Sequence, residues 1–120
     1  MASKPAFLAD NHIRGPALRA LEQDAVVERA ASIFGQRNVD ESVLAYSGDR
    51  GLIMLSSDTD FLKIAVGWCR QGRTSFRMIF WDMKLLYDMT DGEAVAGIWE
   101  IVTRPGAFSY PIEYLKKPKR

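Results

Sequence analysis

The sequence predicts an α/β protein, a three-layer α/β/α sandwich around a small, mainly parallel, twisted sheet. Short apolar runs alternate along the chain with longer segments whose apolar residues have helical spacing. The most apolar run, residues 52–55, follows Gly51 and shows no polar alternation, which is typical of a strand covered by helices on both faces. Strands that alternate with helices form parallel sheets with right-handed crossovers.

Length and composition indicate a single domain over residues 1–120. The chain has 16 Lys and Arg against 15 Asp and Glu, a net charge of +1. We expect its one charged cluster, residues 116–120, to be a basic flexible tail. It has a single cysteine, Cys69, no apolar leader and no apolar run of about 20 residues. These features predict a cytoplasmic protein that does not enter a membrane.

Taken in order, the first half of the chain predicts three strands and two helices. The predicted strands are residues 6–9, 24–28 and 52–55. Pro16 precedes a helix over residues 17–23, and Asp40 is a candidate N-cap of a second helix that we expect Gly48 to end. Between them, residues 29–39 are compatible with a helical turn and a loop.

The second half predicts two or three further helices and two strands. Residues 61–69 have helical spacing of apolar side chains, and residues 76–81 read as the next strand. Residues 83–102 are helical with a break near Thr90. The last segment, 107–115, is extended, and Pro111 restricts it to an edge of the sheet because proline lacks the amide proton.

Acidic residues follow two of the predicted strands. Asp10 follows the first strand, Asp58 and Asp60 follow the third, and Asp40 opens the helix before it. If the two strands are neighbours, these carboxylates meet at one edge of the sheet. Clustered carboxylates raise each other's pKa unless a cation neutralises them, and their oxygens prefer Mg²⁺ or Mn²⁺. Alternatively, Asp40 and Asp58 cap helices and Asp60 interacts with a helix dipole.

Three segments together resemble the compact PIN-like domains, relatives of the PIN-domain ribonucleases that include toxins of bacterial toxin–antitoxin pairs. These segments are residues 7–11, 38–44 and 52–61, and the resemblance extends from residue 6 to about 82. It implies a metal-dependent endoribonuclease that cleaves single-stranded RNA. By resemblance, the catalytic and metal-binding residues are Asp10, Asp40, Asp58 and Asp60, with Mg²⁺ or Mn²⁺ as cofactor. An antitoxin protein is the implied partner, and a homodimer is compatible with the family.

The chain departs from the family pattern at two places. Asn11 and His12 stand where the compact family has an acidic residue and then an asparagine, so the first loop lacks one carboxylate. Ser56 and Ser57 replace a Thr-Arg pair, which removes a basic side chain that could contact phosphate. A catalytically weakened PIN-like interaction module is therefore an alternative, with segment 105–115 as its binding edge.

A haloacid-dehalogenase-like phosphatase is a weaker alternative. Such enzymes also use an Asp-x-Asp pair, with the first Asp as nucleophile and the second as acid and base. Here the pair follows the third strand rather than the first, and Leu62 replaces the expected Thr or Val.

Basic residues of the second half offer a candidate surface for phosphate. Lys63, Arg70, Arg73 and Arg77 could flank the acidic edge and contact RNA, or could be an ordinary solvated surface.

Overall fold

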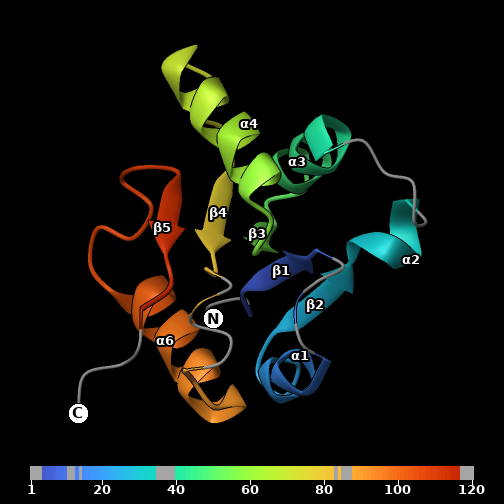
Figure 1. The fold of residues 1–120 in the computed structure, drawn as a ribbon, viewed down its shortest axis with the longest axis vertical. Coiled ribbons are helices and arrows are strands. Elements are labelled where there is room, and N and C mark those ends of the chain that lie inside the picture. Colours follow the sequence, from blue (N-terminus) through green and yellow to red (C-terminus); the bar gives the residue numbers. More distant parts are fainter. Residues whose placement is uncertain are drawn as a thin grey trace.

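The computed structural model describes residues 4–10, 13, 15–34, 40–82, 84 and 88–116, and strands alternate with helices through them (Figure 1). The elements are β1 (Ala6–Ala9), α1 (Gly15–Leu21), β2 (Val26–Arg29), α2 (Ala30–Phe34), α3 (Asp40–Asp49), β3 (Ile53–Ser56), α4 (Thr59–Arg70), β4 (Arg77–Phe80), α6 (Asp91–Thr103) and β5 (Ile112–Tyr114). The predicted alternation is confirmed.

The strands form one sheet in the order β2-β1-β3-β4-β5, and every neighbouring pair is parallel. The α/β class is therefore confirmed, with a wholly parallel sheet. β1 and β3 lie side by side, with Phe7 opposite Ile53 and Ala9 opposite Leu55. From β1 the chain passes to β2 at one edge of the sheet, and from β3 it passes through β4 to β5 at the other edge. The strand order therefore changes direction between β1 and β3. In open parallel sheets, such a switch point is where ligands bind, beyond the carboxyl ends of the strands.

Helices cover both faces of the sheet. Alternate strand residues point to opposite faces, so each strand contributes to two apolar cores. Phe7, Ile53 and Ile79 pack on one face with α1 and α6. Leu8, Met54 and Met78 pack on the other face with α3 and α4. Figure 1 shows the same arrangement, with α3 and α4 on one side of the strands and α1 and α6 on the other.

One connection departs from the predicted right-handed crossovers. The step from β1 to β2 and the step from β4 to β5 run in opposite directions across the sheet, yet α1 and α6 cover the same face. These two connections therefore have opposite hands. The connections through α3 and α4 run across the other face of the sheet and have the same hand as the β1–α1–β2 connection. The β4–α6–β5 connection is therefore the one whose hand differs from the other three. Since α3 and α4 occupy the other face, α6 packs Ile98 and Ile101 beside α1.

The structure changes several predicted boundaries. α3 continues through Gly48 to Asp49, and Gly51, with φ of 66°, makes the turn into β3. The predicted extended segment 107–115 is a strand only over Ile112–Tyr114, because turns occupy the residues before it. Lys116 is described, whereas the rest of the predicted tail lies outside the described residues. In the described part of the chain, no helix has the length and apolar character needed to cross a membrane.

Gly48 allows a close approach between α3 and the segment before β4. A Cβ atom at this position would overlap the backbone carbonyl oxygen of Ser75. We expect Gly48→Ala to lower the free energy of unfolding by about 1 to 2 kcal/mol, because the overlap outweighs the gain of about 1 kcal/mol in helix propensity. Urea denaturation measures the change.

Gly67 provides the matched control in α4, since a Cβ there meets nothing within 4 Å. Gly67→Ala should raise the free energy of unfolding by about 0.5 to 1 kcal/mol. If Gly48→Ala raised the free energy of unfolding as much as Gly67→Ala, a Cβ at position 48 would not overlap the Ser75 carbonyl oxygen.

Candidate active site at the carboxyl edge of the sheet

Asp10 lies at the carboxyl end of β1. Its backbone N–H donates to the carbonyl oxygen of Leu55 at 2.9 Å, which continues the β1–β3 pairing one residue beyond the strand. Its side-chain Oδ2 accepts a hydrogen bond from Ser56 Oγ at 3.0 Å. The sheet register therefore fixes both the backbone and the carboxylate of Asp10.

Ser56 joins the two central strands at this edge. It is the last residue of β3, and none of it is exposed. Its hydroxyl donates to Asp10 and accepts a hydrogen bond from the backbone N–H of Asp58 at 3.1 Å. Sequence reasoning treated Ser56 only as a departure from the family pattern. A hydroxyl at the end of an otherwise apolar, fully buried strand was the available signal, because buried hydroxyls take partners.

Asp58 is the N-cap of α4. Its backbone is extended, with φ of −88° and ψ of 119°, and its Oδ1 accepts a hydrogen bond from the backbone N–H of Asp60 at 2.8 Å. Asp60 is exposed in the first turn of the helix. The capping interpretation is thus confirmed for Asp58. A cap uses one carboxylate oxygen as acceptor, so it is compatible with a second role for this side chain.

Asp40 brings the four predicted site residues into one electrostatic group. It opens α3 and is half-buried. Burial raises the pKa of Asp40 above its ordinary value, and the negative charges of Asp58, Asp10 and Asp60 raise it further, in that order. The end of β1, the start of α3 and the β3–α4 junction therefore present carboxylates to one region of the sheet edge.

The carboxylates are near enough to repel, but the described structure does not gather them into a coordination sphere. Among the described residues, no group of three or more His, Cys, Asp and Glu side chains is placed to hold a metal ion. Asn11 and His12, which follow Asp10, lie outside the described residues.

The structure separates the predicted basic surface from the acidic edge. Arg77 is the first residue of β4 and Arg73 lies just before it, so both are at the amino edge of the sheet. Arg70 ends α4, far along the helix from Asp58. Of the four candidates, only Lys63 lies near the start of α4, where it is exposed. The alternative in which the arginines flank the acidic edge is wrong, because Arg73 and Arg77 lie at the start of β4 rather than after a strand, whereas their exposure agrees with a solvated surface.

Replacement of Ser56 by alanine tests the link between the strands. We expect Ser56→Ala to lower the free energy of unfolding by about 1 to 3 kcal/mol, because the partly buried N–H of Asp58 and the carboxylate of Asp10 each lose a hydrogen-bond partner. Urea denaturation gives the value. Ser42→Ala, on the exposed face of α3, is the control and should change the free energy of unfolding by no more than about 0.5 kcal/mol. If Ser56→Ala and Ser42→Ala changed the free energy of unfolding equally, the Ser56 hydroxyl would have no special role in stability.

The raised pKa of Asp40 predicts a pH-dependent stability. The folded state binds this proton more tightly than the unfolded chain, whose carboxyl titrates near 3.8. The stabilisation by the proton is complete below that pH and is lost as the pH rises through the raised pKa. Asp40→Asn cannot titrate, so we expect its stability to improve relative to the wild type as the pH rises from about 3 to about 7.

Thermal denaturation of both proteins in metal-free buffer across this range measures the effect. A difference in stability that does not change with pH would show that Asp40 does not sense the neighbouring carboxylates.

Comparison with models of known protein families, with curated proteins and with solved structures finds no match to this chain. Its function is therefore inferred from the fold and from the chemistry of the carboxyl edge.

Proposed function

We propose that this chain is a PIN-like, metal-dependent endoribonuclease that cleaves single-stranded RNA, the toxin-like member of a toxin–antitoxin pair. Asp10, Asp40, Asp58 and Asp60 are its catalytic residues. The observation that carries the proposal is the pair of hydrogen bonds made by the Ser56 hydroxyl, which link the Asp10 carboxylate to the backbone N–H of Asp58. The negative charges of Asp58, Asp10 and Asp60 also raise the pKa of Asp40, after burial. These residues come from three separate segments of the chain. Asp10 and Asp58 follow the paired strands β1 and β3, and parallel sheets bind ligands beyond the carboxyl ends of such strands.

The donor set is suited to Mg²⁺ or Mn²⁺. All four side chains offer hard carboxylate oxygens, which Mg²⁺ and Mn²⁺ prefer as ligands. Their mutual repulsion favours a bound cation, which would draw them closer together than they lie in its absence. When bound, such an ion activates water and stabilises charge on a phosphodiester.

The protein's own groups restrict how these carboxylates can move. The Ser56 hydroxyl orients Asp10, and the capping bond to the Asp60 N–H holds Asp58 at the start of α4. Asp40 holds its proton to a higher pH than an isolated carboxyl. A neighbouring cation opposes that shift, so metal binding would lower the pKa of Asp40 and favour its ionised form. The side chains of Asp10 and Asp58 are thus held by hydrogen bonds, whereas those of Asp40 and Asp60 are able to change position.

A protein-binding module is the second candidate, because β5 lies at an edge of the sheet. Tyr110 and Tyr114 on this side are 50% and 49% exposed, which is high for tyrosine. An extended segment of an antitoxin, or of a second copy of this chain, could add to this edge strand. This role is compatible with the nuclease, since β5 and the four aspartates occupy different parts of the sheet.

Asp58→Asn separates metal binding from helix capping. Asparagine is as good an N-cap as aspartate, so the thermal stability without metal should be unchanged or slightly raised. We expect the Mn²⁺ affinity, measured by calorimetry, to fall by about 10- to 100-fold. The rate of cleavage of unstructured RNA should fall by a similar factor. Asp24→Asn, in the exposed turn after α1, is the matched control and should keep both.

Four results would contradict the proposal. Wild-type protein that binds no Mn²⁺ with or without RNA lacks the metal site. Equal loss in Asp24→Asn would show an effect of overall charge. Hydrolysis of a simple phosphate monoester in place of RNA would favour the phosphatase, whereas a stoichiometric protein partner without cleavage would favour the binding module.

A further inference from the structure

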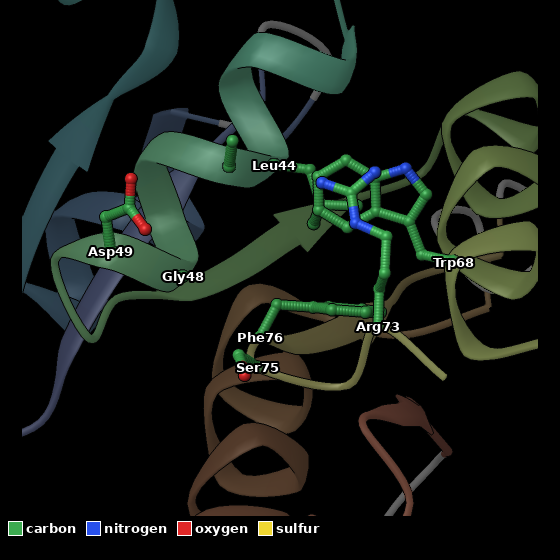
Figure 2. A pocket seen from close by; sticks show the side chains of 8 residues that line it. Leu44, Gly48, Asp49, Trp68, Arg73, Ser75 and Phe76 are labelled. Carbon is green, nitrogen blue, oxygen red and sulfur yellow. The ribbon is translucent and has the colours of Figure 1, made fainter. Parts of the chain in front are cut away.

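Two neighbouring hollows lie at the amino edge of the sheet, opposite the acidic edge. The first, of about 200 Å³, lies between α3, α4 and the segment before β4 (Figure 2). The second, of about 350 Å³, lies between the end of α3 and the loop before β5. Both are lined by Gly48, Ser75 and Phe76, so they form one continuous surface. We call this surface the arginine groove, after the two charged residues that define it, Arg73 and Arg77.

Arg73 lies flat against an aromatic ring in the first hollow. Its guanidinium carbon is 3.6 Å from the centroid of the Trp68 ring, as the stacked side chains in Figure 2 show. Trp68 is in turn fixed by Phe76, which meets it edge-on with ring centroids 5.8 Å apart. The guanidinium is therefore held in a defined plane, although Arg73 is exposed. One face of that plane covers the indole ring.

Arg77 is fixed in the second hollow by two different contacts. Its Nη2 donates a hydrogen bond to the carbonyl oxygen of Gly51 at 2.7 Å, and its guanidinium carbon lies 5.7 Å from the centroid of the Phe108 ring. A guanidinium has five N–H donors, so this single bond leaves others for a ligand. The groove thus presents two oriented guanidinium groups, each beside an aromatic ring.

The positive charge of the groove is not neutralised by ion pairs. Asp49, Arg73 and Arg77 are the charged residues among those that line it. Neither arginine takes part in an ion pair within the described part of the chain. A third stacked arginine lies next to Asp49, since Arg50 covers the ring of Tyr46 at 4.7 Å. This is a local basic surface on a chain whose net charge is only +1.

We propose that the arginine groove binds single-stranded RNA. Guanidinium edges donate to phosphate oxygens, and their planar faces stack on unpaired bases. Aromatic rings beside basic side chains are typical of surfaces that bind single strands. An acidic peptide would use the positive charge but not the flat faces of the guanidinium groups and rings, and the carboxylate of Asp49 repels either anion. The same carboxylate can accept hydrogen bonds from the amino groups of bases.

The choice of RNA as ligand rests on the proposed nuclease function, and the groove extends that function. β3 has four residues and therefore extends about 13 Å from the amino edge of the sheet to the carboxyl edge. An RNA held in the groove could therefore also reach the carboxyl edge. The groove would position the substrate without taking part in the chemistry.

Fluorescence anisotropy of a labelled, unstructured RNA of about ten nucleotides tests the groove, measured in EDTA so that cleavage plays no part. We expect Arg73→Ala and Arg77→Ala each to weaken binding by about 5- to 100-fold. Arg73→Lys keeps the charge but loses the planar stack, and should also weaken binding by at least about fivefold. Arg19→Ala, which removes an exposed charge from α1, is the control and should stay within about twofold of the wild type.

Several outcomes would overturn the proposal. Unchanged binding in the Arg73 and Arg77 variants would remove the groove as the site, provided that melting shows Arg73→Lys to be folded. Equal loss in Arg19→Ala would mean that only overall charge matters. Displacement of the RNA by polyglutamate as effectively as by unlabelled RNA would indicate a site for acidic proteins instead. Because Asp58→Asn should retain binding in EDTA, failure of the nuclease proposal is distinguishable from failure of the groove.

Discussion

The pairing of β1 with β3 is the constraint on which the acidic edge depends. Ala9 lies opposite Leu55, and the bond from the Asp10 N–H to the Leu55 carbonyl extends this register by one residue. A slip of one residue would turn every side chain of a strand to the other face. It would exchange the two apolar cores and separate Asp10 from the Ser56 hydroxyl. The cores and the candidate site therefore depend on one and the same register.

The parallel sheet also separates two kinds of charged surface. Every strand runs in the same direction, so residues that follow strands collect at one edge and residues that precede strands collect at the other. Asp10 and Asp58 follow β1 and β3, whereas Arg73 and Arg77 come at or before the start of β4. The net charge of +1 does not show that acidic and basic residues lie at opposite edges of the sheet. Local charge, rather than the total, decides what each edge attracts.

The sequence allowed the element order to be predicted because local patterns determine it. Continuous apolar runs predict the strands, Asp58 caps α4 as its position suggested, and Thr90, at the predicted break, caps α6. Features that depend on distant residues were missed. The partners of Ser56 and the face chosen by α6 have no local signal. The sequence left open whether the arginines lie beside the acidic edge, because only the direction of β4 shows that Arg73 and Arg77 lie at the opposite edge. The coupling of Asp40 to Asp10 required that β1 and β3 be neighbours, which the sequence left as a condition.

The packing of α6 on α1 has a consequence for synthesis of the chain on the ribosome. One of the two apolar cores joins Leu18 and Leu21 to Ile98 and Ile101, residues about 80 positions apart in the sequence. The part of α1 that contacts α6 consequently stays uncovered until residues 98–101 have been translated. All four aspartates of the candidate site emerge long before that point. A nascent chain therefore carries its acidic residues before α6 can complete the core beneath them, and this delays the fully packed fold until α6 has been translated.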